Sequence, residues 1–287
     1  MFKRLLVITQ TQKGVTKRFM MRKTLIVGYD TTGKNLHREI AALKPDTCDL
    51  RFKENYGTTT PLRKHENYNI IFICVDTPYV NNENPCDLSA IKAVIKEWKG
   101  SLVEGGVFVI KSTILPGTAR RLEHEFNVNI VVSPEYYGNT YHCNNFDFDF
   151  TILGGDKSDC IAVQQVLQHC YDARHQFKIV DHTTAELVKY MENSWLATKV
   201  AFCSQFALLA EQCGVDYEDL RELFILDPRV NPSHTFIDRD KPYWDSHCLN
   251  KDVRAITYTH NADFLLGMIN FNERRKKRSD KNDFAVE

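Results

Sequence analysis

Short apolar runs alternate with stretches of helical periodicity from residue 23 to about residue 181. Continuous apolar runs occur near residues 24–28, 69–74, 105–110, 129–132, 150–155 and 177–181. Such runs are typical of strands that are buried on both faces of a parallel sheet. Between them, apolar residues recur at helical spacing in residues 31–43, 87–98, 118–126 and 160–170. Alternating strands and helices predict an α/β domain with a doubly wound parallel sheet over residues 23–181.

The alternation then stops and one long helical pattern begins. Thr183, with Glu186 three residues later, matches a capping box, and Gly214 is the natural stop. A helix of this length would span roughly 45 Å at 1.5 Å per residue, which is typical of a helix that bridges domains or subunits. A second helical pattern covers about residues 252–272. We predict a helical domain over residues 182–273.

Both ends of the chain are basic. Residues 1–22 contain six Lys or Arg and no acidic residue. This composition resembles an organelle transit segment, but we favour a disordered extension, or a start at Met20 or Met21. Residues 274–287 form a basic tail that could act as a localisation signal, and we favour a solvated, frayed terminus.

The overall composition is that of a soluble globular protein, with 43% hydrophobic and 26% charged residues. Lys plus Arg balances Asp plus Glu at 37 each, so no global field favours nucleic acid or an anionic membrane as a partner. The nine cysteines are an odd number without CxxC pairs, which favours reduced thiols over disulfides or a zinc site. No apolar stretch approaches the roughly 20 residues of a membrane span. We expect a cytoplasmic protein.

The turn after the first predicted strand, IVGYDTTG, is close to a dinucleotide fingerprint. Gly28 and Gly33 occupy the first and third glycine positions, between a predicted strand and helix. The middle position holds Asp30, whose carboxylate would repel a pyrophosphate. The acidic residue that binds the ribose is expected roughly 20 or more residues later, where Glu54 follows Lys53. The pattern leaves two interpretations open: a cofactor site, or a sheet that has lost its dinucleotide.

The stretch DSHCLNKDVRAI, residues 245–256, holds a cysteine in polar surroundings. Free cysteines behave mostly as small hydrophobic residues, which favours a core role for Cys248. Its polar neighbours resist unpaired burial, and the ammonium of Lys251 would favour the reactive thiolate. The stretch by itself therefore leaves both a core thiol and a nucleophile open.

Four further polar residues stand at positions suited to a site. Lys189 and Asn193 are four residues apart on the long predicted helix, so they project from one face of a largely apolar segment. Thr113 and Glu135 each follow a predicted strand, at the edge where open α/β sheets bind ligands. Capping and turn roles explain each residue singly, whereas their coincidence indicates a functional site.

The order of these pieces resembles the UDP-glucose/GDP-mannose dehydrogenase family. The matching stretches, in family order across residues 23–275, are IVGYDTTG, ICVDTP with CDLSAI, KSTILPGT, SPEYYGN, AELVKYMENSWLATKVAF, LDPRV and CLNKDVRAI. The resemblance implies a Rossmann-like domain, then a helical dimerisation domain, with NAD as the cofactor and a homodimer as the assembly. It also implies oxidation of a nucleotide-sugar C6 alcohol to the carboxylate, of the UDP-glucose to UDP-glucuronate type, through a thioester on Cys248.

The resemblance also assigns roles to the other candidates. Asp252 and Thr113 match residues that hold and activate the hydrolytic water, while Lys189 and Asn193 match residues that stabilise developing oxyanions. Glu135 matches a glutamate beside the reacting carbon.

Substrate and cofactor contacts are implied in the same way. Arg229 matches an arginine that reaches the substrate across the dimer interface, and Asn139, in the SPEYYGN loop, is expected to contact the substrate. The expected cofactor contacts are Gly28, Asp30, Thr32, Gly33, Glu54, Val75, Thr77, Pro78 and Lys251.

The chain departs from the family pattern in three ways. Asn139 replaces a second glutamate, and Asp245, Ser246 and His247 replace the glycines before the cysteine. The chain is also expected to lack the family's second Rossmann-like domain, which binds the nucleotide half of the substrate. Two alternatives to an active enzyme therefore stay open: an inactive binding protein that kept the fold, and a split enzyme whose nucleotide-binding domain is another polypeptide.

Overall fold

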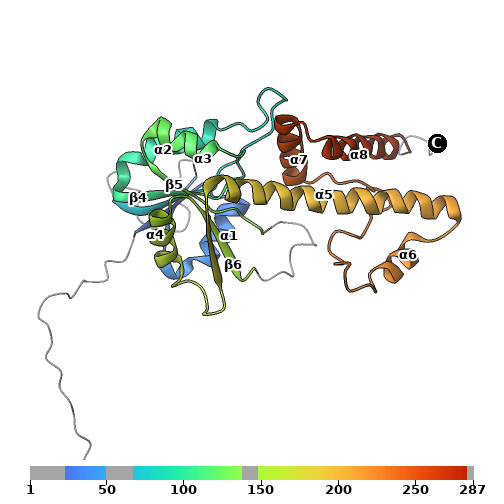
Figure 1. Ribbon diagram of the computed structural model, residues 1–287, viewed down its shortest axis with the longest axis horizontal. Coiled ribbons are helices and arrows are strands. Elements are labelled where there is room, and N and C mark those ends of the chain that lie inside the picture. Colours follow the sequence, from blue (N-terminus) through green and yellow to red (C-terminus); the bar gives the residue numbers. More distant parts are fainter. Residues whose placement is uncertain (1–22, 50–66, 138–147, 283–287) are drawn as a thin grey trace, which may run out of the picture.

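The computed structural model describes residues 23–49, 67–137 and 148–282, and these contain a seven-stranded sheet with strand order β2-β1-β3-β4-β5-β6-β7 (Figure 1). The strands are β1 (Thr24–Val27), β2 (Asp46–Cys48), β3 (Tyr68–Ile73), β4 (Leu102–Ile110), β5 (Asn129–Val132), β6 (Phe150–Gly154) and β7 (Gln176–Val180). Strands β1 to β5 are parallel, whereas β6 runs antiparallel to β5 and parallel to β7. The predicted α/β fold is confirmed, with one antiparallel pairing in a mostly parallel sheet.

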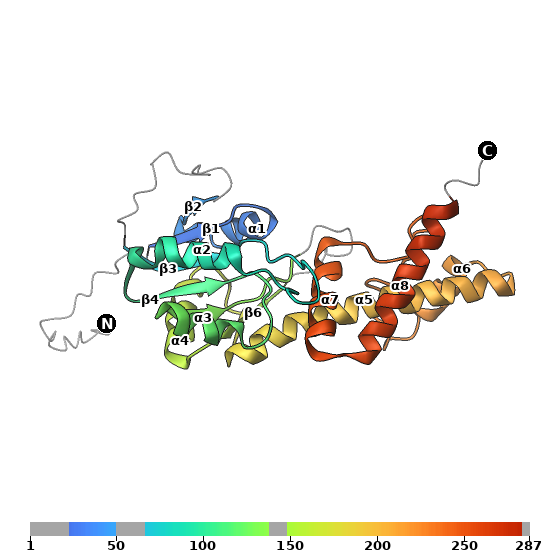
Figure 2. The same cartoon turned by 90° about the horizontal axis from the view of Figure 1, so that it is seen from above.

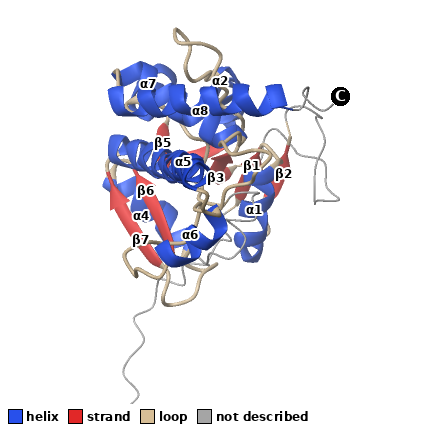
Figure 3. Cartoon of the chain, turned by 90° about the vertical axis from the view of Figure 1, so that its right-hand side faces the viewer, coloured by secondary structure: helices blue, strands red, loops and turns tan. Residues whose placement is uncertain are grey.

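The sheet is buried on both faces because successive side chains alternate across it. On β1, Leu25 and Val27 join the core under α2 and α3, while Ile26 joins the core under α1 and α4. These helices are α1 (Thr31–Glu39), α2 (Ser89–Trp98), α3 (Thr118–Phe126) and α4 (Lys157–Leu167). Figure 3 shows helices on both sides of the strands. Burial on two faces explains the continuous apolar runs in the sequence.

The carboxyl ends of the central strands lie side by side. Ile73 is paired in register with Ile110, and Ile110 with Val132. Because β3, β4 and β5 end at this common edge, the loops that follow them, including those of Thr113 and Glu135, leave the sheet at the same edge.

The long predicted helix is α5 (His182–Cys213), and it ends at Gly214 in the left-handed conformation, φ 69°. Its predicted cap is wrong, because the N-cap is Asp181, whose side chain accepts a hydrogen bond from Thr184 N at 3.0 Å. Glu186 closes no capping box. Its buried carboxylate accepts hydrogen bonds from Gly117 N at 2.5 Å and from Ala119 N at 2.7 Å, at the start of α3. Glu186 therefore joins α5 to the sheet domain.

The helical domain differs from the predicted single second helix. Residues 252–272 are divided between α7 (His247–His260) and α8 (Asp263–Asn282), with Asn261 in the left-handed conformation at the break, φ 51°. The predicted frayed tail from residue 274 is wrong as far as residue 282, because α8 continues through the basic run. Figure 2 shows α7 and α8 beside the part of α5 that extends away from the sheet.

A separate apolar core holds these helices together. Ala197 and Ala201 of α5 pack with Leu249 and Val253 of α7 and with Ile269 of α8. The short helix α6 (Tyr217–Phe224), which the sequence analysis did not predict, follows α5. Small residues on α5 allow the two other helices to approach it closely.

Some predictions fall outside the described residues, namely those on residues 1–22, Lys53, Glu54, Asn139 and residues 283–287. Within the described parts of the chain, no helix is both long and apolar enough to cross a membrane.

The Glu186 contact gives a test of how the two domains are joined. Replacing Glu186 with Gln sets an NH2 group against one of the two N–H donors at the start of α3, which leaves a buried donor without an acceptor. We expect the free energy of unfolding to fall by about 1–3 kcal/mol, measured by urea denaturation. The exposed Glu211→Gln variant on the same helix is the control and should change it by less than about 0.5 kcal/mol. Equal stability of the two variants would contradict a joining role for Glu186.

Candidate active site

A buried carboxylate on α7 is bound by side chains from two helices. Asp252 is 1% exposed, and its Oδ2 accepts a hydrogen bond from Asn193 Nδ2 of α5 at 2.6 Å. Its other oxygen, Oδ1, lies 2.5 Å from Lys251 Nζ. The structure therefore brings together three of the residues that the sequence singled out. Both oxygens of Asp252 are engaged, so its position relative to α5 is fixed.

Cys248 is the second residue of α7 and is exposed, which excludes the buried core role. Ser246 caps this helix by accepting a hydrogen bond from Leu249 N at 3.3 Å. Cys248 precedes Asp252 by four residues, so both project from the same side of α7. The first turn of a helix stabilises negative charge, which favours the thiolate over the thiol.

Lys189 lies one turn before Asn193 on α5, and its closest partner is a residue that the sequence analysis missed. Its Nζ is 2.5 Å from Glu192 Oε2 and 4.9 Å from the ring centroid of Tyr136. Burial raises the pKa of Glu192, and the nearby charges of Asp252 and Glu135 raise it further, while Lys189 opposes them. Glu192 is thus an acidic side chain close to the candidate residues Lys189, Asp252 and Glu135. The sequence did contain a signal for this pair, because residues three apart on a helix lie on neighbouring turns of one face.

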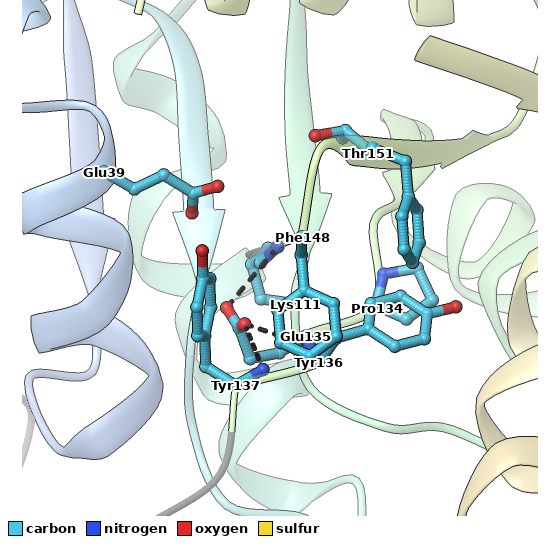
Figure 4. Close-up of a pocket in the computed structure, with 9 residues that line it drawn as sticks. Glu39, Lys111, Pro134, Glu135, Tyr136, Tyr137, Phe148 and Thr151 are labelled. Atoms are coloured by element: carbon cyan, nitrogen blue, oxygen red, sulfur yellow. Dashed lines mark hydrogen bonds and ion pairs between the residues drawn. The ribbon is translucent and has the colours of Figure 1, made fainter. Parts of the chain in front are cut away.

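Glu135 follows β5 and is held from two sides (Figure 4). Its Oε1 accepts hydrogen bonds from the backbone N–H groups of Tyr136 at 3.0 Å and Tyr137 at 2.9 Å. Its Oε2 lies 3.6 Å from Lys111 Nζ, an ion pair in which both side chains are about one-tenth exposed. The Glu135 carboxylate is thus held in place by two backbone N–H groups and one ammonium group.

Thr113 lies in the loop after β4, beside a second thiol. Its carbonyl oxygen accepts a hydrogen bond from Thr77 Oγ1 at 2.7 Å and a longer one from Cys86 Sγ at 3.9 Å. Burial raises the pKa of Cys86, and the opposing charges of Lys251 and Asp252 also act on it. Cys86 is therefore held as a thiol beside the Thr113 carbonyl, within electrostatic reach of Lys251 and Asp252.

The turn between β1 and α1 retains the tight geometry of a dinucleotide site. Gly28 has φ 96°, and a side chain there would meet Cys74 O at 2.3 Å, while one at Gly33 would meet Gly28 O at 2.0 Å. Asp30 is the N-cap of α1, and its Oδ1 accepts a hydrogen bond from Thr31 N at 2.9 Å. The glycines fit a dinucleotide, and Asp30 places a negative charge at the helix end where a pyrophosphate binds.

An acidic residue follows β2, a strand that the sequence analysis did not identify. Asp49 comes directly after β2, is 2% exposed, and its Oδ2 accepts a hydrogen bond from Tyr29 N of the glycine turn at 3.3 Å. It stands about 20 residues after Gly28, as a ribose-binding acid does. Asp49 therefore fits this role by position, whereas Glu54 lies outside the described residues.

Four other expected cofactor contacts lie on α1 and in the loop after β3. Thr32 is half-buried in the first turn of α1, and Val75 lies beside Gly28, where an added Cβ would be 3.1 Å from Val75 Cγ1. Thr77 is buried, and Pro78 is exposed and accepts a hydrogen bond from Asp87 N at 2.9 Å. Val75 therefore lies at the glycine turn, and Thr77 and Pro78 follow it in the loop after β3.

Arg229 lies apart from these groups. It follows α6, its side chain is 88% exposed, and its Nη2 is 2.6 Å from Asp227 Oδ2. Within the described parts of this chain, Arg229 is therefore not part of the Asp252 cluster.

The chain matches one known family over most of its length. Residues 42–174 match the UDP-glucose/GDP-mannose dehydrogenase family, NAD binding domain, and residues 183–273 match the central domain of the same family. A UDP-N-acetyl-D-mannosamine dehydrogenase of Pyrococcus horikoshii is 28% identical over 271 residues, covering 88% of this chain and 62% of that protein. A UDP-glucose 6-dehydrogenase of Rickettsia prowazekii is 27% identical over 214 residues, covering 72% of this chain and 47% of that protein.

The fold is also found in solved structures. A UDP-glucose dehydrogenase from Pyrobaculum islandicum superposes with a TM-score of 0.74 at 19% identity, over 91% of this chain and 70% of that chain. The UDP-D-ManNAc dehydrogenase of Pyrococcus horikoshii gives a TM-score of 0.73 at 23% identity, over 88% and 68%. The chain spans about half the length of the curated relatives, 47% for one and 62% for the other.

The positions of two exposed cysteines allow a direct test of Cys248. Cys213 is the last residue of α5, at the C-terminal end of that helix, while Cys248 is in the first turn of α7. We expect iodoacetamide to label Cys248 at least about tenfold faster than Cys213 at neutral pH, measured by peptide mass spectrometry. Equal rates at these two exposed thiols would count against a nucleophilic Cys248.

The charge of Asp30 gives a test of the cofactor turn. Asp30→Asn retains a capping side chain without the charge, and Asp30→Gly removes both charge and bulk. If the charge opposes the pyrophosphate, both variants should bind NAD about tenfold more tightly, measured by calorimetry. Tighter binding by the Gly variant alone would show that bulk is the obstacle. No change in either would contradict an effect of Asp30 on the cofactor.

Proposed function

The chain belongs to the UDP-glucose/GDP-mannose dehydrogenase family, and we propose that it oxidises the C6 alcohol of a nucleotide sugar to the carboxylate. The reaction is of the UDP-glucose to UDP-glucuronate type. NAD is the cofactor that the matched domain binds in this family. The observation that carries the proposal is the exposed Cys248, one turn before an Asp252 that Asn193 and Lys251 hold in place.

The proposed reaction is a four-electron oxidation, RCH2OH + 2 NAD⁺ + H2O → RCOO⁻ + 2 NADH + 3 H⁺. NAD, when bound, accepts a hydride in each of the two oxidations. Cys248 Sγ adds to the carbon of the aldehyde formed first, which gives a thiohemiacetal. Loss of the second hydride leaves a thioester on Cys248, and water cleaves the C–S bond to release the carboxylate and the thiolate.

The surrounding residues take the roles that the family resemblance implies. Asp252 and Thr113 hold and activate the hydrolytic water, and the Asn193 hydrogen bond keeps the Asp252 carboxylate in place. The ammonium of Lys189 and the amide of Asn193 stabilise the oxygen on which negative charge develops. Glu135 acts as a carboxylate beside the reacting carbon.

A second candidate function is supported by the glycine turn. Asp30 places a carboxylate at the N-terminus of α1, and Asp245, Ser246 and His247 stand where the resemblance implies a glycine-containing loop. Both features favour a protein that binds a nucleotide sugar or another partner without turnover. A split enzyme is the remaining alternative, in which turnover appears only when a separate nucleotide-binding polypeptide is added.

The assembly that we propose is a homodimer formed along α5. Apolar side chains spaced three, four or seven residues apart form an exposed stripe on this helix: Leu187, Met191, Trp195, Phe202, Phe206 and Leu209. Met191 is 73% exposed and Trp195 is 61% exposed. An apolar stripe of this length is typical of an interface between subunits. The stripe lies on a different side of α5 from Lys189 and Asn193, so a second copy would leave those two side chains uncovered.

The stoichiometry of NADH tests the proposed reaction. With a limiting nucleotide sugar, we expect two NADH for each carboxylate formed, measured by absorbance and by mass spectrometry of the product. Cys248→Ser should lower carboxylate formation by at least about a thousand-fold and leave the unfolding midpoint unchanged. NADH formation that is unaffected by this substitution would exclude the thioester route. Binding of NAD and sugar without any NADH would favour the second candidate function.

The apolar stripe on α5 gives a test of the assembly. Trp195→Glu places a charge in the proposed interface, so we expect light scattering to show a monomer where the wild type is a dimer. Val80→Glu is the matched control, because Val80 is 55% exposed and lies in the loop after β3. A wild-type monomer, or a dimer that survives Trp195→Glu, would contradict the interface.

A further inference from the structure

Lys111 is a buried cation that has no role in the proposed reaction described above. It comes directly after β4, and its side chain is only 9% exposed. Lysine is almost never buried without a partner, because removing an ammonium from water is costly. Its ion-pair partner is Glu135 Oε2 at 3.6 Å. The fold therefore places a positive charge behind a carboxylate of the candidate site.

The negative charge of Glu135 is balanced by the ammonium group of Lys111. One of its oxygens is fixed by the backbone N–H groups of Tyr136 and Tyr137, so the carboxylate cannot turn without losing two hydrogen bonds. The other oxygen is buried and makes no hydrogen bond with a described side chain, and the charge that it faces is Lys111 (Figure 4). A buried carboxylate stays ionised only when hydrogen-bond donors or groups of opposite charge stand close to it, and for this second oxygen the positive group is Lys111.

The same conclusion follows from the lysine side. Burial alone lowers the pKa of Lys111, but the charge of Glu135, followed by that of Glu39, outweighs burial and the pKa is raised. Glu39 is the last residue of α1 and points into the same pocket (Figure 4), where Tyr171 donates a hydrogen bond to it at 2.6 Å. The ammonium is therefore kept charged by two acidic side chains.

The space beside this pair limits what Lys111 can touch. The pocket that Lys111, Glu135 and Glu39 line has a cavity volume of about 20 Å³. This is room for a single water molecule and not for a sugar ring. The space beside Lys111 therefore admits no sugar, and its ion-pair partner in the candidate site is Glu135.

We infer that Lys111 is a positioning residue, which keeps Glu135 ionised and fixed in place for the oxidation of the sugar. This inference rests on the proposed function, in which Glu135 acts as a carboxylate beside the reacting carbon. Without the ammonium, the buried Glu135 would take up a proton at a higher pH than it does in the wild type. Arg at this position would preserve the charge.

The pH dependence of turnover tests this role. We expect Lys111→Met to move the acid limb of the kcat/KM profile upward by about one pH unit or more, and Lys111→Arg to restore most of the shift. Lys92→Met is the control, because Lys92 pairs with Glu125 at 2.8 Å on the surface, and its profile should match the wild type. An unshifted acid limb in Lys111→Met, with a uniform loss of rate at every pH, would show a merely structural lysine and overturn the inference.

A second measurement needs no turnover and separates the inference from the proposed function. Above the pH at which carboxylates ionise, Lys111→Met should lower the urea midpoint, and Lys111→Met combined with Glu135→Gln should recover it, because the unpaired charge is gone. Additive effects of the two substitutions would overturn the pairing. If the wild type oxidises no nucleotide sugar, the proposed function fails by itself, and this unfolding cycle alone decides whether Lys111 maintains the charge of Glu135.

Discussion

The candidate site depends on one buried carboxylate. Asp252 is bound by Asn193 from α5 and by Lys251 from its own helix, at 2.6 and 2.5 Å. A charge this deeply buried is stable only while both partners are present, and loss of one partner of such a pair costs about 3–5 kcal/mol. Because Cys248 lies one turn before Asp252, the same contact sets where the thiol stands relative to α5. The chemistry that we propose therefore requires the contact between α5 and α7, through Asn193 and Asp252, to be intact.

Helix α5 connects the contact between Asn193 and Asp252 to the cofactor domain. Near its first turn, Glu186 accepts two hydrogen bonds from the start of α3, and farther along it, Asn193 binds Asp252. A helix is stiff over this short distance, so the loops at the carboxyl edge of the sheet and the Cys248 turn are held in a fixed relation. Lys189 lies between these two contacts, beside Glu192. Helix α5 thus contributes Lys189 and Asn193 to the site and contacts both domains.

The sequence predicted the sheet because each strand is buried on both faces, and it predicted Lys189, Asn193, Thr113 and Glu135 as candidates because each follows a strand or shares a helical face. It could not predict the partners of Glu186, because a capping box is a local rule and the real donors, Gly117 and Ala119, lie 69 and 67 residues away. Strand β2 escaped notice because it has three residues, one of them Asp46. The break at Asn261 carries no Gly or Pro signal. Glu192 was missed because a charged residue on a long helix usually faces water, and only the fold brings Asp252 and Glu135 near it.

The central claim is that Cys248 carries the sugar as a thioester, and trapping that species tests it most directly. Asp252→Asn should slow the hydrolytic water, so the variant is mixed with NAD and a nucleotide sugar that the wild type oxidises, quenched in acid and mapped by peptide mass spectrometry. The account predicts an acyl adduct on the peptide that contains Cys248, which hydroxylamine releases. Continued carboxylate formation by this variant with Cys248 unmodified at every time point would contradict it.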